Sequence, residues 1–223
     1  MQYFSQVAWH LHKPMLNKLP DSFVTPLVEF IRLSHSHIAT LNYDNLLYQA
    51  LIEAGVLAGY NGALVDGFLS SGFAADNLER KYGNTFGWYL HLHGTPLFVD
   101  SPTGEVFKQP QGGATCYATR HLVLTHVKHK PSVIDSSEVL REYWRRLAIA
   151  LEESGELIVF GYSGTDEHLN TLIRSTVRCR KRVIEWYGAG AHDDRARFWT
   201  EQLGDVALIQ LPSVLDFTSW EAV

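Results

Sequence analysis

Residues 156–177, ELIVFGYSGTDEHLNTLIRSTV, contain the most regular pattern in the chain. The apolar run ELIVF predicts a buried strand of the parallel type. Gly161 opens a polar turn, and Thr165 or Asp166 can then cap a helix. Helical spacing places one set of side chains inward: Leu169, Leu172, Ile173 and Thr176. A strand, an abrupt turn and a capped helix together form a βα unit.

The segments on both sides of this unit repeat its alternation. Residues 135–154 predict a helix that ends at Gly155. Further along, a strand is predicted over RVIEWY (182–187), a helix over HDDRARFWTEQLG (192–204) and a last strand over DVALIQL (205–211). Such alternation implies right-handed crossovers. It predicts an α/β fold, Rossmann-like and doubly wound, with a mostly parallel sheet and helices on both faces.

The N-terminal half gives shorter signals. Residues 22–33 predict a helix with Ser22 as its N-cap, and HSHIATLN (35–42) predicts a buried strand. DNLLYQALIEAG (44–55) predicts a helix that Asp44 caps and Gly55 stops, and WYLHLHG (88–94) predicts a strand that ends at its glycine.

The remaining segments are interpreted as connections within one domain. Residues 56–87 and 99–118 are rich in Gly, Pro, Asn or Ser and predict long loops or a lid. Within 56–87 we expect a fragment or two of regular structure, for example around Asp66, Gly67 and Phe68. HLVLTHV (121–127) fits a strand or a connection. No repeat interrupts residues 1–223, so we predict a single domain over that range.

Composition narrows the class of protein. The chain has 223 residues, is 46% hydrophobic and carries a net charge of −5. These values favour a globular protein and argue against a general nucleic-acid or anionic-membrane binder. No apolar run approaches the roughly 20 residues of a membrane helix, and no signal peptide is apparent. We expect a cytoplasmic protein.

The metal-ligand patterns are weak. Cys116 and Cys179 are the two cysteines and do not form a CxxC pair, so a zinc ribbon and a disulfide framework are not expected. Histidines two residues apart (10 and 12, 35 and 37, 91 and 93) lack accompanying ligand spacing, and HExxH is absent. We predict no metal.

Three polar turns directly follow predicted strands: TLNYD (40–44), HLHG (91–94) and GYSGTD (161–166). Ligands of open parallel sheets bind beyond the carboxyl ends of the strands, so we expect the three turns to converge. The amide of Asn42 can hold a ligand or a water. Asp44 can do the same, although capping explains it equally well.

His93 and the GYS turn offer further chemistry. A neutral imidazole accepts a proton near neutral pH, although most histidines are ordinary surface residues. Gly94 permits a turn and a close approach by a ligand. The backbone N–H groups of Gly161, Tyr162 and Ser163 can contact a phosphate or ribose at a helix start. The turn lacks the G-x-S-x-G spacing of a nucleophile elbow.

In this order, TLNYD, HG and GYSGTD resemble the motifs of sirtuin-like domains in bacterial NAD-depleting antiphage effectors. The resemblance covers roughly residues 36–187. It implies cleavage of the nicotinamide–ribose bond of NAD, which is a substrate, in antiphage defence. A homo-oligomer or a partner subunit is also implied.

The resemblance also implies roles for single residues. Asn42 would orient the attacking water, and His93 would be the general base. A second group would bind the nucleotide: Thr40, Asp44, Gly94, Gly161, Tyr162 and Ser163.

Two departures separate this chain from the family pattern. Two cysteines cannot build the four-cysteine zinc module of protein deacetylases, so NAD hydrolysis is favoured over deacetylation. No glycine precedes Asn42, whereas the family has a G-A-G-x-S-type loop that cradles the pyrophosphate. We therefore expect the first βα unit to be missing. The alternatives are a non-catalytic module that binds NAD or ADP-ribose or assembles with a partner, and an unrelated α/β hydrolase or nuclease.

Overall fold

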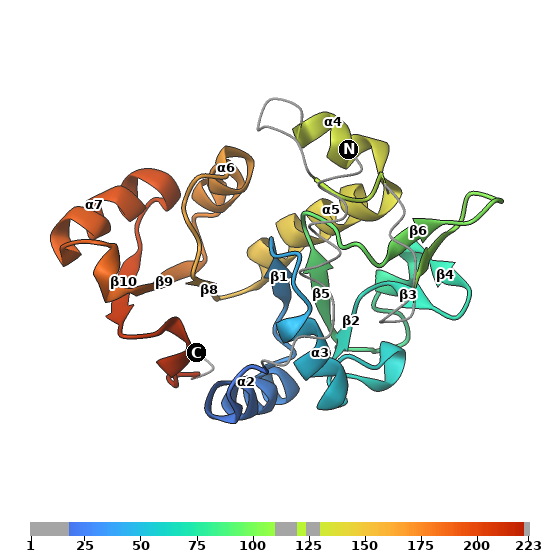
Figure 1. Ribbon diagram of the computed structural model, residues 1–223, viewed down its shortest axis with the longest axis horizontal. Helices are drawn as coiled ribbons and strands as arrows, with labels where there is room; N and C mark the ends of the chain where they lie inside the picture. The colour runs from blue at the N-terminus through green and yellow to red at the C-terminus, as the bar shows by residue number, and fades with distance from the viewer. Residues whose placement is uncertain (1–17, 110–119, 124–129, 221–223) are drawn as a thin grey trace. The chain divides into compact units, whose positions relative to one another are not determined.

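A computed structural model describes residues 18–109, 120–123 and 130–220 (Figure 1). The chain forms two compact units. The first comprises Met1–Leu19 and Val28–Leu147, and the second comprises Pro20–Leu27 and Ala148–Val223. The predicted single domain stays a prediction, and each unit is described by itself below.

The first unit is built on a three-stranded parallel sheet, in the order β1-β5-β2. Its strands are β1 (Ile38–Thr40), β5 (Gly87–His91) and β2 (Leu64–Val65). The last residue of β1, Thr40, is paired with the last residue of β5, His91. Because the two strands are parallel and end together, the chain leaves both at the same edge of the sheet.

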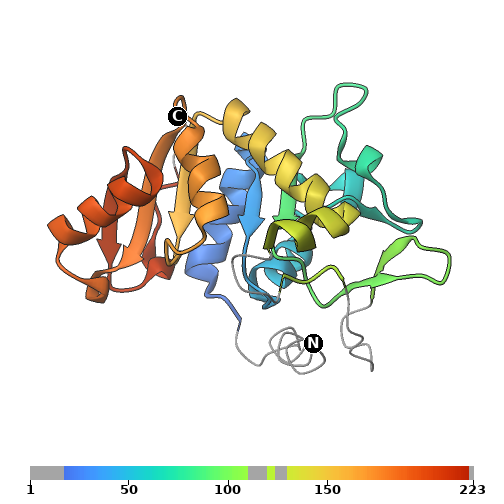
Figure 2. The same ribbon diagram turned by 90° about the horizontal axis from the view of Figure 1, so that it is seen from above.

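Helices cover both faces of this sheet (Figure 2). On one face Tyr48, from α3 (Leu46–Glu53), packs edge-on against Tyr89 of β5. On the other face Arg146, from α5 (Glu138–Glu153), lies over the ring of Trp88, 5.1 Å from its centroid. Trp88 and Tyr89 are neighbours in a strand, and successive side chains point to opposite faces.

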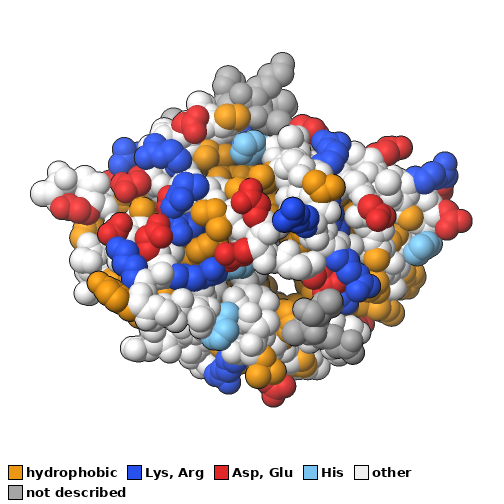
Figure 3. Space-filling view, turned by 180° about the vertical axis from the view of Figure 1, so that it is seen from behind, with side chains coloured by type: hydrophobic (Ala, Val, Ile, Leu, Met, Phe, Trp, Pro, Cys, Tyr) orange, Lys and Arg blue, Asp and Glu red, His pale blue; other side chains and the backbone are white. Residues whose placement is uncertain are grey.

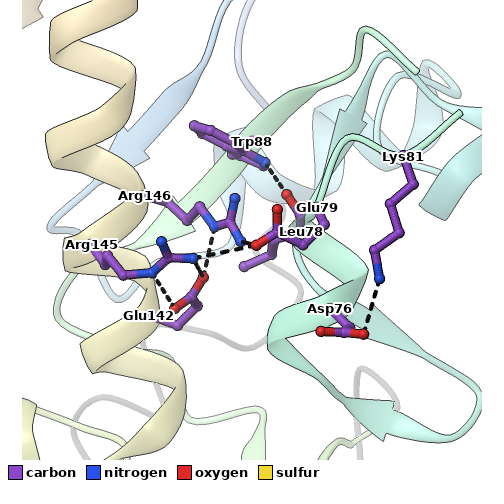
Figure 4. A network of polar contacts seen from close by, with 8 residues as sticks. All are labelled: Asp76, Leu78, Glu79, Lys81, Trp88, Glu142, Arg145 and Arg146. Atoms are coloured by element: carbon purple, nitrogen blue, oxygen red, sulfur yellow. Dashed lines mark hydrogen bonds and ion pairs between the residues drawn. The ribbon is translucent and has the colours of Figure 1, made fainter. Parts of the chain in front are cut away.

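A network of hydrogen bonds and ion pairs joins α5 to the segment that carries Glu79 (Figure 4). Arg146 is 4% exposed in its side chain and bonds to Glu142 at 2.7 Å and to Glu79. Arg145 also donates to Glu142, at 2.7 and 2.8 Å. The indole of Trp88 donates to the carbonyl of Leu78 at 3.0 Å, which holds the neighbouring 3-10 turn against the strand. The buried charges are thus paired, as buried charges must be.

The two predicted long loops contain regular structure. Residues 56–87 include β2, a third strand of the parallel sheet that was not predicted, and the antiparallel pair β3 (Phe68–Leu69) and β4 (Gly72–Phe73). Strands of two residues are too short to show a period. The segment also holds two 3-10 turns, η1 (Gly59–Asn61) and η2 (Ala75–Leu78).

The second predicted loop, 99–118, is partly a hairpin. The prediction was wrong for β6 (Phe98–Asp100) and β7 (Val106–Lys108), which pair antiparallel across a turn that contains Gly104. Residues 110–119, with Cys116, lie outside the described residues. In 121–127 the described part forms a single bridge, Leu122 with Gly94, and α4 (Lys130–Ser136) follows.

The second unit is a parallel sheet in the order β10-β9-β8. Its elements agree with the predicted alternation: β8 (Glu156–Phe160), α6 (Glu167–Ser175), β9 (Arg180–Trp186), α7 (His192–Leu203) and β10 (Ala207–Leu211). Two 3-10 turns, η4 (Tyr187–Ala189) and η5 (Val214–Asp216), follow β9 and β10.

Both faces of this second sheet are covered as well. Figure 2 shows α6 and α7 side by side, and the indole of Trp199 in α7 donates to Glu185 of β9 at 2.8 Å. Phe160 is paired with Ile184, one residue before Glu185, so its side chain points to the opposite face. An aromatic cluster covers Phe160 there: Phe23, Phe217 and Trp220. The predicted α/β, Rossmann-like architecture of parallel sheets flanked by helices is confirmed.

Three local predictions were wrong. The first predicted helix, α2, spans Asp21–Ser34, and Ser22 lies inside it because the carbonyl of Pro20 already accepts from Phe23. The strand over 88–94 ends at His91, so His93 lies in a turn. The predicted buried strands β1 and β8 are partly exposed, because each is an edge strand among the described residues.

The surface carries both signs of charge. On the face in Figure 3, Lys and Arg side chains are interspersed with Asp and Glu. This mixture agrees with the small net charge of −5. A large single-sign patch of the kind that steers nucleic acids is not seen on this face.

Candidate functional site

The TLNYD turn leaves the sheet at the carboxyl end of β1. The backbone N–H of Asn42 donates to Oγ1 of Thr40 at 3.1 Å, which fixes the direction of the chain after the strand. Asn42 itself is exposed. Its amide is therefore accessible at this edge of the sheet, and its role towards a ligand stays a prediction. Thr40 has a structural part in the turn, since its hydroxyl is an acceptor within it.

Asp44 lies one residue before Asn45, the N-cap residue of helix α3. The prediction that Asp44 itself is the cap was wrong by one residue, and the side chain of Asn45 makes no cap hydrogen bond. Oδ1 of Asp44 nevertheless accepts from the backbone N–H of Leu46 at 3.0 Å, one of the N–H groups that a helix start leaves open. A further role at the nicotinamide end stays a prediction.

The HLHG turn leaves the sheet at the carboxyl end of β5. It is closed by a hydrogen bond from the N–H of Gly94 to the carbonyl of His91 at 2.9 Å. His93, within the turn, is half-buried. Gly94 has φ +76°, and a Cβ there would lie 1.6 Å from the carbonyl oxygen of His121. What approaches Gly94 closely in this structure is therefore the protein backbone.

The two histidines of the HLHG turn lie in different surroundings. His91 is 1% exposed and packs among the rings of Tyr48, Tyr89 and Phe98, with ring centroids 5.0–5.8 Å apart. It belongs to the core, whereas His93 lies beyond the strand. His93 was predicted as the reactive histidine for its place before a glycine, and this difference in burial supports that prediction.

Tyr43 links the two turns, a role that the sequence analysis did not assign to it. Its ring lies 6.2 Å from the ring of His93, and its hydroxyl donates to the carbonyl of Val123. Burial raises the pKa of the Tyr43 phenol to about 12, so the group is neutral at physiological pH. The TLNYD and HLHG turns therefore lie side by side, as predicted from the parallel strands.

Lys130 and Trp144 also belong to this site and were missed. The ammonium nitrogen Nζ of Lys130 lies 2.9 Å from Nε2 of His93 and 4.8 Å from the centre of the Trp144 ring. Lys130 is 4% exposed and Trp144 is 7% exposed. Lys130 follows His93 by 37 residues, and no local pattern relates the two.

The GYSGTD turn follows β8 in the second unit. Gly161 has φ +56°, a left-handed conformation that favours glycine. The hydroxyls of Ser163 and Thr165 lie 2.8 Å apart, and both residues are exposed. Asp166 caps α6 by accepting from the N–H of Leu169 at 3.2 Å, which confirms one of the two predicted caps. Ser163 and Thr165 are therefore the polar side chains that this turn presents outward.

Tyr162 has a structural role within the same turn. Its hydroxyl bonds to Oδ1 of Asn170 at 2.7 Å and accepts from the N–H of Asp166 at 2.9 Å. Gly164 permits close packing, because a Cβ there would meet the Phe198 ring at 2.8 Å. A nucleotide contact by Tyr162 stays a prediction. The convergence of this turn with TLNYD and HLHG also stays a prediction, since they belong to different units.

The described ranges contain neither a metal-binding cluster nor a membrane-spanning helix. Within 18–109, 120–123 and 130–220, no group of three or more His, Cys, Asp or Glu residues is placed to hold a metal ion. Cys179 is a buried free thiol, and burial raises its pKa. None of the helices in the same ranges is both long and apolar enough to span a bilayer.

The family model of the SIR2-like domain matches residues 36–203 of this chain. The matched region includes all three polar turns and the strands that precede them. No curated protein matches the chain.

Proposed function

Because this chain belongs to the family of SIR2-like domains, which are NAD-related, we propose that it cleaves the nicotinamide–ribose bond of NAD. The products would be nicotinamide and ADP-ribose. A role in bacterial antiphage defence, and assembly as a homo-oligomer or with a partner subunit, are part of the same proposal.

One observation carries this proposal. β1 and β5 are parallel neighbours that end at the same level, Thr40 opposite His91. Asn42 and His93 each follow two residues later, and the ring of Tyr43 lies beside His93. An amide and an imidazole therefore share one edge of a parallel sheet, where ligands of such sheets bind.

These two side chains suit the chemistry of the reaction. Cleavage of an N-glycosidic bond to a ribose passes through an oxocarbenium-like state, so the site must position a water more than supply a strong nucleophile. The exposed amide of Asn42 would orient that water. The water oxygen bonds to the ribose carbon as the bond to nicotinamide breaks, and nicotinamide leaves with the electron pair. His93 would accept the proton released.

The GYSGTD turn suits the other end of NAD. Its exposed Ser163 hydroxyl, beside that of Thr165, can donate to a ribose or phosphate oxygen. The carboxylate of Asp166 already accepts from the helix N–H of Leu169. We therefore expect nucleotide contacts through the hydroxyl pair and the turn backbone more than through the start of α6.

The test is to incubate the purified chain with NAD and to quantify nicotinamide by chromatography. Asn42→Ala and His93→Ala should abolish its release, whereas His192→Ala, an exposed histidine at the start of α7, should leave it unchanged. Absence of nicotinamide from the wild-type chain at high protein concentration would reject the proposal.

A second candidate is a non-catalytic module that binds NAD or ADP-ribose. Calorimetry separates the two: heat of nucleotide binding without nicotinamide release supports the module, and turnover supports the enzyme.

A further inference from the structure

Lys130 is a buried lysine at the first position of α4. Lysine is almost never this buried unless its ammonium group has a partner. Nε2 of His93 lies 2.9 Å from Nζ, within hydrogen-bond distance. The burial and the short distance together make this a specific contact of the site.

Trp144 of α5 holds both members of this pair. Its ring centre lies 4.8 Å from Nζ of Lys130, in the range of a cation–π interaction. Its indole N–H donates to the carbonyl of Leu92, one residue before His93, at 2.9 Å. One side chain thus fixes the ammonium group and the backbone that carries the imidazole.

The chemistry of the two groups decides which atom donates. A lysine ammonium has three N–H donors and no acceptor, so Nε2 of His93 must be the acceptor. A neutral imidazole that accepts at Nε2 carries its proton on Nδ1.

Two further titratable groups are described near His93, and both are neutral. The Tyr43 phenol is neutral, because burial raises its pKa to about 12. His121, whose segment bridges to Gly94, is also held towards its neutral form, since burial lowers its pKa. Lys130 is the charged group for which a contact with the imidazole is described.

We infer that Lys130 is a positioning residue for His93: by donating to Nε2 it selects the tautomer that has its lone pair on Nε2 and its proton on Nδ1. The neutral ring is the form that a general base requires. This part of the inference concerns the substrate-free chain and does not depend on any reaction.

A consequence for catalysis follows, and it rests on the proposed function. The hydroxyl or water that His93 deprotonates must take the place of the ammonium group at the single lone pair of Nε2, so the hydrogen bond between Nζ of Lys130 and Nε2 breaks and Nζ then lies beside the reacting oxygen. Its O–H bond breaks, the proton forms an N–H bond at Nε2, and negative charge develops on the oxygen next to the ammonium group. A nearby cation stabilises such charge.

The decisive experiment observes the tautomer directly. The substrate-free chain, labelled with ¹⁵N in its histidines, is studied by long-range ¹H–¹⁵N correlation NMR at a pH where the rings are neutral, and a His93→Gln variant assigns the signals. We expect the proton of His93 on Nδ1. In Lys130→Met the signals should shift towards the Nε2–H tautomer, and Lys130→Arg, which keeps a cationic donor, should resemble the wild type.

Lys181→Met is the matched control. Lys181 is also buried, at 7% exposure, but it donates to the carbonyl of Leu203 in the second unit, so its loss should leave His93 unchanged. A wild-type ring protonated on Nε2 would overturn the inference even if Lys130→Met failed to fold. An unchanged tautomer in a folded Lys130→Met chain would also overturn it.

Enzyme activity provides a second measurement, and its outcome is independent of the NMR result. If the chain cleaves NAD, Lys130→Met should lower kcat by up to about 100-fold with a smaller effect on KM, as expected when a reacting group is misplaced. Lys130→Arg should recover part of this loss. If the wild-type chain releases no nicotinamide, the proposed function fails while the NMR result still decides the role of Lys130.

Discussion

Tyr43 and Val123, 80 residues apart in the chain, are joined by a hydrogen bond from the phenol to the backbone carbonyl. The N–H of the same Val123 residue donates to the carbonyl of His93 at 3.0 Å. One backbone residue thus ties the turn that carries Asn42 to the turn that carries His93. The geometry of the candidate site depends on this bridge as much as on the sheet.

Tyr43→Phe should therefore weaken both the fold and the site. Loss of the hydroxyl leaves a carbonyl of the buried Val123 without this donor, which typically costs about 1–3 kcal/mol. Urea unfolding measures the change in the free energy of unfolding, and nicotinamide release measures the effect on the site. Tyr60→Phe removes an exposed hydroxyl and should cost less. Equal costs for the two variants would contradict the bridging role.

Tyr43 also gives a pH dependence. Burial raises its pKa to about 12, above the ordinary tyrosine value of 10.0. The folded chain therefore keeps the phenol proton at pH values where the unfolded chain releases it, and stability falls as pH rises from about 10 to about 12. The contribution of Tyr43 is measured by urea unfolding at several pH values: the free energy of unfolding should fall more steeply in the wild type than in Tyr43→Phe. Parallel curves in the two proteins would refute the assigned burial.

Gly94→Ala should destabilise the chain more than Gly83→Ala. Both glycines have a positive φ, +76° and +80°, so each substitution incurs the backbone penalty of about 1–2 kcal/mol. Only at Gly94 does the new Cβ meet the His121 carbonyl oxygen, at 1.6 Å, whereas nothing lies within 4 Å at Gly83. Overpacking adds about 1–3 kcal/mol. Chemical unfolding of both variants tests the difference, and similar losses would disprove the close approach.

Tyr162→Phe tests whether this hydroxyl is structural. It bonds to Asn170 and to the backbone of Asp166, so its loss should lower the free energy of unfolding by about 1–3 kcal/mol. Tyr187→Phe, at a side chain 59% exposed, is the control and should be nearly neutral. A variant that keeps its stability but loses nucleotide affinity in calorimetry would instead place the hydroxyl on the ligand.

The sequence predicts the C-terminal half of the fold best. There the strands β8, β9 and β10 have five or seven residues and the helices between them have nine and twelve, long enough to show a period. β2 has two residues and gives no such signal. The hairpin of β6 and β7 lies where Gly and Pro suggest a loop, and its pairing is decided by tertiary contacts.

In the candidate site, too, only the residues that belong to a local sequence pattern could be predicted. Asn42 and His93 could be found because each follows an apolar strand in a polar turn, and strand order then brings the turns together. Lys130 could not be found, since its role depends on a contact with His93 across 37 residues. The structural contacts of Tyr162 could not be predicted either, because the sequence does not show that its hydroxyl turns back onto the start of α6.

The close approach at Gly94 has a consequence for related chains. The backbone carbonyl of His121 lies where a side chain at position 94 would begin, so both cannot be present. A relative with a larger residue at the position of Gly94 must also have moved the segment that carries Val123, and with it the acceptor for the phenol of Tyr43. We therefore expect positions 43, 94 and 123 to vary together during evolution. A glycine at position 94 then indicates that the backbone around His121 passes close to it, as it does here.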